Sequence, residues 1–358
     1  MNDMGQNAKT RDLLLRQCQT YPDLQIQDIF KFLYQSSFGC EHLVSSCEKV
    51  TQYIREEYNH VRTLNHPATE PLDGDYSRVS LSFLDQGMAP ETLGKIFFLS
   101  AKKEADGEKL LREKIDVVKE MAREKSFSFT SEEFEKEAAI WEANGFPAVR
   151  HSDVFRSKYS PSYRVIANKY IPFLPLFIEI DKHLRKGRVR VAIEGGSASG
   201  KTTLSGMLYE NYGCTVFHTD DFFLRPEQRT AERYAETGGN FDRERFLEEV
   251  LIPLGNNDII SYRRFDCTEM KLQPATEVRP GKLTIVEGAY SMHPELADFY
   301  DFSVFLDIPS DLQKKRIMKR NSPQMAERFF NEWIPLEKTY FEATQVKKRC
   351  DMCIHICF

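Results

Sequence analysis

The sequence predicts an α/β domain with a five-stranded parallel sheet over residues 186–358, preceded by an α-rich domain over residues 1–185. Three observations lead to this prediction. The chain has 358 residues, which exceeds the ~100–200 that one core usually holds. Apolar residues recur at helical spacing before the segment Arg185-Lys186-Gly187, whereas short apolar runs alternate with helical stretches after it. A glycine-rich loop directly follows the first of these runs, where a strand would lead into a helix.

Helical periodicity dominates the first domain. Residues 24–34 and 107–124 carry apolar side chains three and four positions apart, which predicts two amphipathic helices. The segment Thr130-Ser131-Glu132-Glu133 has the order of a capping box and predicts a further helix that ends before Gly145. Polar and apolar residues alternate over 77–83, which predicts one short strand.

Basic and aromatic residues interleave between residues 150 and 170 of the first domain. They are Arg150, His151, Arg156, Lys158, Tyr159, Tyr163, Arg164, Lys169 and Tyr170. Such a mixture can stack on single-stranded nucleic acid and neutralise it. The position just before the second domain favours a different interpretation, in which the segment lines the active site or the junction between the domains. A solvated face is the third interpretation.

Five apolar runs after residue 187 have the length of buried strands. They are residues 189–193, 214–217, 283–286, 303–306 and 352–357. Helical stretches separate them, which predicts parallel strands joined by crossover helices. Function is therefore expected at the carboxyl ends of these strands.

The last run contains Cys353, His355 and Cys357 at alternating positions, so these residues share one face of a strand. The same residue types also bind zinc. A closed zinc site usually draws on two separated pairs of ligands, however, and no second pair is evident in the sequence. We therefore expect a final strand.

The loop after the first run has the spacing Gly-x4-Gly-Lys-Thr of a phosphate-binding loop. Glycines let backbone N–H groups converge on phosphate oxygens, Lys201 adds positive charge at the β- and γ-phosphates, and the Thr202 hydroxyl can bind magnesium. The expected ligand is a nucleoside triphosphate. The residues predicted to bind it are Gly195, Gly196, Ser197, Ala198, Ser199, Gly200, Lys201, Thr202 and Thr203.

Carboxylates follow the second and third runs. The second run ends in His218-Thr219-Asp220-Asp221, and the third ends in Val286-Glu287-Gly288. A phosphoryl acceptor needs a base to take its proton, and magnesium prefers oxygen ligands. We predict Asp220 as the general base and Glu287 as a magnesium ligand beside Thr202. Either acid can instead cap the following helix, and Asp221 fits both interpretations.

Five motifs occur in an order that is typical of one enzyme family. They are Gly-Gly-Ser-Ala-Ser-Gly-Lys-Thr-Thr at 195–203, Thr-Asp-Asp-Phe-Phe at 219–223, Asn-Phe-Asp at 240–242, Val-Glu-Gly at 286–288 and Phe-Leu-Asp-Ile-Pro at 305–309. Residues 187–358 thereby resemble the uridine kinase and phosphoribulokinase-like family of P-loop kinases for small molecules. The first domain lies outside this resemblance.

The resemblance implies roles for individual residues. Asp220 would take the proton of the acceptor hydroxyl, Asp242 would bind sugar hydroxyls, and Glu287 would hold Mg²⁺. Family members also close an arginine-bearing lid over the phosphates. Arg316 and Arg320 fit the place of this lid, and because they lie four positions apart they share a helix face. As catalytic residues together with Asp220 and Lys201, they would stabilise the charge on the transferring phosphoryl group.

The segment expected to recognise the acceptor departs from the family pattern. Residues 261–267 read Ser-Tyr-Arg-Arg-Phe-Asp-Cys, where uridine kinases carry a Tyr-Asp-Phe-like segment followed by a histidine that reads the base. Tyr262 and Phe265 can sandwich a ring. Arg264, with Arg263, suits an anionic acceptor such as a sugar phosphate. Nucleoside-like and sugar-like acceptors therefore both remain open.

Composition sets limits on partners and location. The net charge of −5, with 29% charged residues, argues against a general nucleic-acid-binding surface. The chain starts with polar residues, and two prolines interrupt its longest apolar stretch, residues 170–178, which falls short of the ~20 residues that span a bilayer. We therefore expect a cytoplasmic protein without a membrane partner, whose eight cysteines are reduced thiols.

Three functional hypotheses follow. The first is an ATP- and Mg²⁺-dependent kinase that phosphorylates a hydroxyl of a nucleoside-like or sugar-like small molecule. The second is a nucleotide-dependent switch with the first domain as sensor or effector, although no Asn-Lys-x-Asp segment follows the loop. The third is an RNA-end or nucleotide-processing kinase whose first domain binds nucleic acid.

Overall fold

The computed structural model of the chain describes residues 3–40, 44, 46–60, 66–101 and 106–357. Its backbone divides into two compact units, Met1–Leu174 and Pro175–Phe358, called unit 1 and unit 2 below. The sequence predicts a boundary after residue 185, at the end of helix α9 (Leu174–Leu184). The observed boundary instead lies at the start of this helix, so that α9 belongs to unit 2 from Pro175 onward. None of the helices in the described residues combines the length and the apolar character needed to cross a bilayer.

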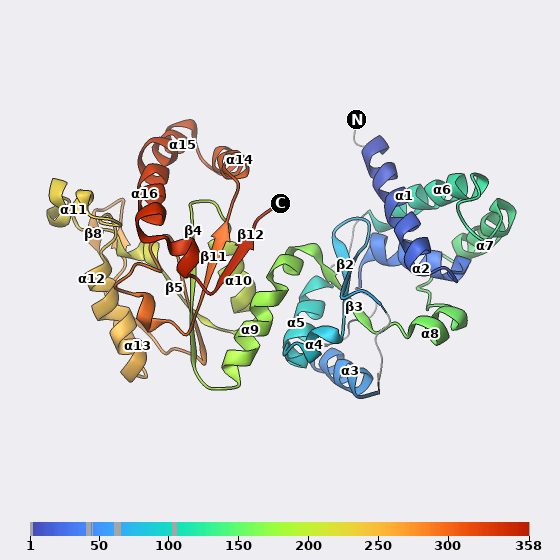
Figure 1. Cartoon of the computed structure of the whole chain (residues 1–358), viewed down its shortest axis with the longest axis horizontal. Helices are drawn as coiled ribbons and strands as arrows, with labels where there is room; N and C mark the ends of the chain where they lie inside the picture. The colour runs from blue at the N-terminus through green and yellow to red at the C-terminus, as the bar shows by residue number, and fades with distance from the viewer. Residues whose placement is uncertain (1–2, 41–43, 45, 61–65, 102–105, 358) are drawn as a thin grey trace. The chain divides into compact units, whose positions relative to one another are not determined.

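Unit 1 consists of helices around one small antiparallel sheet (Figure 1). The sheet has the order β1-β2-β3, from β1 (Thr69–Pro71), β2 (Tyr76–Ser80) and β3 (Tyr163–Ala167). Its helices are α1 (Asp3–Thr20), α2 (Ile26–Phe38), α3 (Cys47–His60), α4 (Ser82–Asp85), α5 (Pro90–Ser100), α6 (Gly107–Arg123), α7 (Ser131–Ala143), α8 (Asp153–Tyr159) and η2 (Asn168–Phe173). Helices α1, α2 and α7 pack against α6, and α3 packs against α5, which in turn contacts β3.

The periodicity of unit 1 predicted its long helices. The helices expected at 24–34 and 107–124 are confirmed as α2 and α6. The capping box is also confirmed, because the Thr130 hydroxyl accepts the Glu133 N–H (3.2 Å) and the Glu133 carboxylate accepts the Thr130 N–H (2.8 Å). The strand expected at 77–83 is present as β2, but it stops at Ser80 because the chain turns into α4.

Unit 2 is built on a five-stranded sheet in the order β12-β11-β4-β10-β5, and every neighbouring pair is parallel. The strands are β4 (Val189–Gly195), β5 (Thr215–His218), β10 (Leu283–Glu287), β11 (Phe302–Asp307) and β12 (Met352–His355). All five predicted strands are therefore present, and the predicted parallel arrangement is confirmed. In the central strand β4, Val191, Ala192 and Ile193 have no exposed surface.

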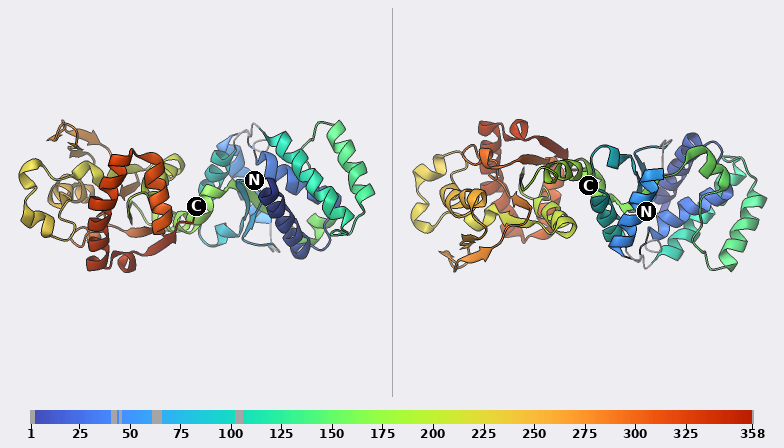
Figure 2. Two further views of the ribbon diagram at one scale, coloured as in Figure 1. Left: turned by 90° about the horizontal axis from the view of Figure 1, so that it is seen from above. Right: turned by 90° about the horizontal axis from the view of Figure 1, so that it is seen from below.

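Helices and short hairpins surround this sheet. The helices are α10 (Lys201–Tyr212), η3 (Thr219–Phe222), η4 (Pro226–Gln228), α11 (Ala231–Ala235), α12 (Arg243–Phe246), η5 (Leu247–Leu251), α13 (Ile252–Asn256), η6 (Ala297–Phe299), α14 (Ser310–Arg320), α15 (Pro323–Arg328), η7 (Phe329–Trp333), α16 (Ile334–Thr344) and α17 (Val346–Arg349). Two antiparallel pairs join β6 (Ile260–Tyr262) to β9 (Thr276–Val278) and β7 (Phe265–Asp266) to β8 (Lys271–Leu272). Figures 1 and 2 show that the elements between β5 and β10, coloured yellow to gold, gather at one end of unit 2.

The register of the sheet brings the carboxyl ends of the inner strands to one edge. Glu287, at the end of β10, pairs with His218, at the end of β5. On the other side of β4, Gly195 pairs with Leu306 of β11. The loop after β4 and the acids after β5 and β10 therefore lie at the same edge, as expected for a parallel sheet.

Candidate active site

The loop between β4 and α10 requires glycine at its two ends. Gly195 has a φ of +149°, and a Cβ at this position would lie 2.7 Å from the Leu306 carbonyl oxygen. Gly200 has a φ of +104° and caps the start of α10. The first N–H groups of a helix have no partner within the helix and carry partial positive charge. The start of α10 therefore has the geometry and charge of an anion site.

Lys201 folds its side chain over this loop. Its ammonium donates hydrogen bonds to the carbonyl oxygens of Gly195 (2.8 Å) and Gly196 (3.0 Å). Its positive charge helps to hold the pKa of Glu287 below its ordinary value and opposes the rise in the pKa of Asp220. Lys201 is thus close to both predicted acids as well as to the loop.

The two predicted magnesium ligands are in direct contact. The Thr202 hydroxyl donates to Glu287 Oε1 at 2.9 Å, and His218 Nδ1 lies 2.7 Å from the same oxygen. Burial would raise the pKa of Glu287, but the hydrogen bond from His218 and the charge of Lys201 hold that pKa below its ordinary value. Conversely, the Glu287 carboxylate raises the pKa of His218. A buried, ionised carboxylate beside a hydroxyl fits a divalent cation.

Asp220 lies in the one-turn helix η3 after β5 and is exposed to solvent. The surrounding protein raises the pKa of its carboxyl, Glu287 adds to this effect, and Lys201 opposes it. A carboxylate that is reachable from solvent and more basic than usual suits a general base. The adjacent Asp221 differs, because its carboxylate faces Arg264 Nε at 3.4 Å.

Two acids that no motif indicated, Glu337 and Glu194, connect helix α16 to the loop. Glu337 accepts the Ser197 N–H at 2.9 Å and the Ser197 hydroxyl at 2.6 Å. Glu194 is completely buried and accepts the Gly195 N–H (2.8 Å) and the Tyr340 hydroxyl (3.1 Å). Burial raises the pKa of both carboxyls, that of Glu194 to about 7. A carboxylate from α16 therefore occupies one backbone amide of the phosphate-binding loop.

Helix α14 also contacts the loop, through one of its two predicted arginines. Arg316 Nη1 donates to the carbonyl oxygens of Ala198 (3.0 Å) and Ser199 (3.3 Å). Gln313, which the sequence did not single out, donates to the Ser197 carbonyl at 2.8 Å. The guanidinium of Arg320 instead lies 5.5 Å above the ring of Phe329. The two arginines thus face different surroundings despite their spacing of one helical turn.

The segment predicted to recognise the acceptor is folded into ion pairs and core contacts. Tyr262 is only 3% exposed and packs against Phe217 and Phe222, and Phe265 is also buried. Arg264 donates to the Tyr262 hydroxyl at 3.3 Å, in addition to its pairing with Asp221. The Tyr262 ring stacks on Phe222, so a ligand ring would have to share it with this partner. The assignment of Tyr262, Arg264 and Phe265 to the acceptor remains a prediction.

Asp242 and Arg263 each have an intramolecular partner. Asp242 caps α12, is 1% exposed, and accepts from Arg245 Nε at 3.1 Å. Arg263 donates from Nε to Glu249 at 3.0 Å. The sugar-binding role predicted for Asp242 also remains a prediction, since a sugar would have to share this carboxylate with Arg245.

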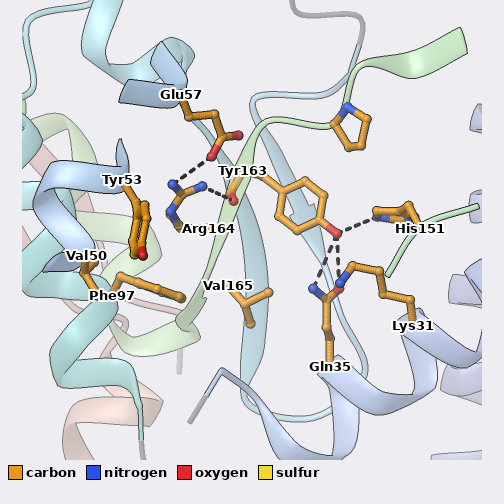
Figure 3. Close-up of a pocket in the computed structure, with 11 residues that line it drawn as sticks. Lys31, Gln35, Val50, Tyr53, Glu57, Phe97, His151, Tyr163, Arg164 and Val165 are labelled. Atoms are coloured by element: carbon orange, nitrogen blue, oxygen red, sulfur yellow. Dashed lines mark hydrogen bonds and ion pairs between the residues drawn. The ribbon is translucent and has the colours of Figure 1, made fainter. Parts of the chain in front are cut away.

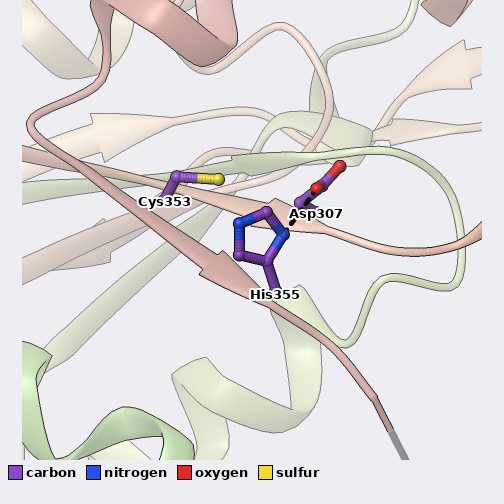
Figure 4. A group of neighbouring side chains, drawn as sticks. All are labelled: Asp307, Cys353 and His355. Atoms are coloured by element: carbon purple, nitrogen blue, oxygen red, sulfur yellow. Dashed lines mark ion pairs between the residues drawn. The ribbon is translucent and has the colours of Figure 1, made fainter.

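The last strand places two of its polar residues beside the end of β11 (Figure 4). Potential ligand atoms of Asp307, Cys353 and His355 all lie within 4.8 Å of one another. The Lys347 ammonium lies 2.7 Å from the same Asp307 oxygen that faces His355 Nδ1, and its positive charge disfavours a cation there. The opposite face of the run carries buried Ile354 and Ile356, so the interpretation as a strand is confirmed.

Known proteins resemble unit 2. The model of the phosphoribulokinase / uridine kinase family matches residues 190–328. A uridine kinase from Limosilactobacillus reuteri (strain DSM 20016) is 30% identical over 153 residues, which cover 40% of this chain and 68% of that protein. A uridine kinase from Chlamydia pneumoniae is 27% identical over 183 residues, or 46% of this chain and 80% of that protein.

A solved structure described as a possible uridine kinase from Bacillus stearothermophilus has a TM-score of 0.38 and 22% identity, covering 50% of this chain and 99% of that chain. The matched residues 190–328 contain the phosphate-binding loop, the acids after β5 and β10, and the arginines of α14. Through unit 2, the chain belongs to the phosphoribulokinase and uridine kinase family.

Proposed function

We propose that unit 2 is an ATP-dependent kinase that transfers the γ-phosphoryl group to a hydroxyl of a nucleoside-like or sugar-like small molecule. The observation that carries this proposal is the contact between Thr202 and Glu287, with Lys201 and the accessible Asp220 beside it. These contacts support the proposal, because positive charge for a phosphoryl group and a base for an alcohol would then lie at one edge of the sheet.

The phosphates of ATP would bind at the start of α10. Backbone N–H groups of the loop and the ammonium of Lys201 would hold the β- and γ-phosphates. Arg316, which is already fastened to the loop, adds a positive charge close to the transferring group. Most of the catalysis would come from this positioning and charge stabilisation.

Thr202 and Glu287 would hold the magnesium ion that accompanies ATP, because they offer two oxygen atoms 2.9 Å apart. When bound, the ion would neutralise charge that develops on the phosphate oxygens. His218 would orient Glu287, since it lies 2.7 Å from one carboxylate oxygen.

Asp220 would act on the acceptor. Its carboxylate takes the proton of the acceptor hydroxyl as the new O–P bond forms, while the bond between the γ-phosphorus and the bridging oxygen breaks and ADP leaves. The raised pKa of this carboxyl favours proton uptake.

A screen of acceptors tests the proposal. Purified full-length protein with ATP and Mg²⁺ would be offered nucleosides, sugars and sugar phosphates in turn, and ADP release would be measured. The proposal predicts that a member of these classes stimulates ADP release and is recovered as its phosphate ester. ADP release that no acceptor stimulates would contradict it.

Asp220→Asn is expected to lower acceptor-dependent turnover about a hundredfold to ten-thousandfold, because the amide cannot accept the proton. ATP affinity, measured by calorimetry, should stay close to that of the parent. Asp298→Asn, at an exposed position outside the site, is the matched control. Near-normal turnover of Asp220→Asn would refute the assignment of the base.

A nucleotide-dependent switch is the second candidate, and the contact of Glu337 with the Ser197 amide favours it. Phosphate binding at this amide would displace Glu337 and release one attachment of α16. The acceptor screen separates the two candidates, because an acceptor hydroxyl would not stimulate ADP release by a switch.

A further inference from the structure

Unit 1 contains a cavity beside strand β3 (Figure 3). Its volume is about 310 Å³, and a second recess of about 290 Å³ shares Lys31, His151 and Pro161 with it. We call the two together the β3 pocket. Volumes of this size accommodate small organic ligands. Part of the pocket lining comes from residues 150–170, the interleaved basic and aromatic segment. None of the lining residues belongs to the candidate kinase site.

One end of the β3 pocket is rich in positive charge. Lys31 of α2 lies where the two recesses join, and Arg150 and Arg156 line the outer recess. The Lys31 ammonium donates to the Val149 carbonyl (3.1 Å), and within the described part of the chain no carboxylate forms an ion pair with Lys31 or Arg150. Arg156 has only the exposed Asp153 at 3.7 Å. These cations therefore lack strong acidic partners.

The side chains that line the wall next to Lys31 are polar and neutral: Gln35, His151 and Tyr163. His151 Nδ1 faces Asp28 Oδ1 at 2.8 Å, and His151 Nε2 lies 2.6 Å from the Tyr163 hydroxyl. Burial lowers the pKa of His151 to about 4, so the imidazole is neutral at pH 7. We assign the proton to Nδ1, which donates to Asp28, so that Tyr163 donates to Nε2. Ser152 also donates two hydrogen bonds to the Asp28 carboxylate, which forms no ion pair with Lys31 although its charge partly offsets the effect of burial on the Lys31 pKa.

Burial also lowers the pKa of Lys31 to about 8, since a desolvated ammonium is costly. A bound anion would offset this cost. Arg164 and Glu57 also line the cavity. They form an ion pair at 2.8 Å, so their opposite charges largely cancel.

The other end of the β3 pocket is apolar and aromatic. Val50, Tyr53, Phe97 and Val165 line it, on the side of Tyr163 away from Lys31 (Figure 3). Tyr53 is 63% exposed. An exposed ring at the mouth of a cavity offers a surface on which a flat group can stack.

We propose that the β3 pocket binds a small organic phosphate that carries a flat ring, with the phosphate at Lys31, Arg150 and Arg156 and the ring at Tyr53 and Phe97. A phosphate monoester carries about −1.5 to −2 charges at neutral pH, which matches several cations better than one carboxylate does. The small volume favours a small molecule over a nucleic-acid strand, which needs an extended track of charge.

Calorimetric titration of the full-length protein with UMP, without ATP, tests the phosphate end of the pocket. Lys31→Met and Arg150→Gln should each weaken UMP binding about tenfold, because each removes one charge-assisted contact. Lys31 is half-buried, and its replacement can disturb folding, whereas Arg150 is exposed. Arg150→Gln therefore tests the phosphate end even if Lys31→Met does not fold. Lys136→Met, at an exposed position on α7, should bind UMP like the parent.

Ribose 5-phosphate, which lacks the flat base, tests the ring end. Tyr53→Ala should weaken UMP binding about tenfold and leave the affinity for ribose 5-phosphate unchanged, since stacking is lost only for the base. Binding of UMP that Lys31→Met and Arg150→Gln leave unaltered belongs to another site and overturns the proposal. So does the absence of UMP binding at millimolar concentration, or much tighter binding of a single-stranded oligonucleotide at the same residues.

This test does not depend on the proposed kinase activity, because it measures binding without phosphoryl transfer. A failed acceptor screen would not change the result of the UMP titration. Likewise, a failed UMP titration would not change the result of the acceptor screen.

Discussion

Glu194 shows at the scale of one residue how burial and hydrogen bonding compete. Its carboxylate accepts N–H groups of Gly195 and Met292 and the Tyr340 hydroxyl, yet it has no exposed surface. Desolvation outweighs these hydrogen bonds and raises its pKa to about 7. The folded protein therefore holds a proton on Glu194 at pH values where the unfolded chain has lost it.

This shift predicts a pH dependence of stability. Because the folded pKa is raised from 4.5, the free energy of unfolding should fall as pH rises from about 4.5 to about 7 and level off above, by ~3 kcal/mol in all. Glu194→Gln should remove this component, and urea unfolding at pH 5 and pH 8 measures it. Glu210→Gln, at an exposed position of α10, is the control. Parallel pH profiles of parent and Glu194→Gln would contradict the assignment.

Sequence reasoning identified the residues at strand ends and missed those that tertiary packing supplies. Lys201, Thr202, Asp220 and Glu287 could be predicted because the ends of parallel strands must meet at one edge. Glu337 and Gln313 could not, since they reach the loop only through the docking of α16 and α14, and no local pattern encodes that docking. His218 directly precedes the acids after β5, but its contact with Glu287 depends on the register of β5 against β10.

At the scale of elements, helix α14 distinguishes two arginines that the sequence treats alike. Arg316 holds the loop carbonyls of Ala198 and Ser199, whereas Arg320 stacks on Phe329. Arg316→Ala should lower kcat/KM for ATP on the order of tenfold or more, because a charge near the phosphates is lost. Arg320→Ala should stay close to the parent. Equal losses in steady-state assays of the two variants would mean that Arg320 moves onto the phosphates during turnover.

Helix α16 carries Glu337, whose carboxylate accepts the Ser197 N–H, a backbone amide of the loop proposed to bind phosphate. Glu337→Gln keeps the shape of the side chain but removes a negative charge beside the loop, so ATP should bind about fivefold more tightly. Calorimetry with ATP and Mg²⁺ measures this change, and Glu342→Gln, at an exposed position of the same helix, is the control. Weaker ATP binding would instead show that the carboxylate holds the loop in its binding shape.

The secondary structure of unit 2 was easier to predict than that of unit 1. Contiguous apolar runs mark strands that are buried on both faces, and all five runs proved to be strands. Strand β1 spans only three residues, too few to show an alternating pattern. Strand β3 lies inside the basic and aromatic segment, whose charges obscured its alternation.

At the scale of the whole molecule, the boundary between the units decides which fragment is stable. Helix α9 buries Leu176, Phe177 and Ile180, and its Asp181 accepts the Tyr212 hydroxyl at the end of α10 (3.0 Å). A fragment of residues 187–358 lacks this helix and should melt at least ~5 °C below residues 174–358, because apolar surface becomes exposed. Calorimetric melting of both fragments measures the difference.

The longer fragment should also keep acceptor-dependent ADP release close to that of the full chain, since every residue proposed for the chemistry lies in unit 2. A large loss of activity in residues 174–358, with a normal melting temperature, would show that unit 1 contributes to the reaction.

Strand β11 prevents the replacement of Gly195 by any larger residue. The Leu306 carbonyl leaves no room for even a methyl group there, and β11 cannot retreat because it pairs with β4 on one side and β12 on the other. A larger residue at position 195 would therefore require β11 to shift within the sheet. Gly206, by contrast, has open space where a Cβ would lie, so it can be replaced without such a shift.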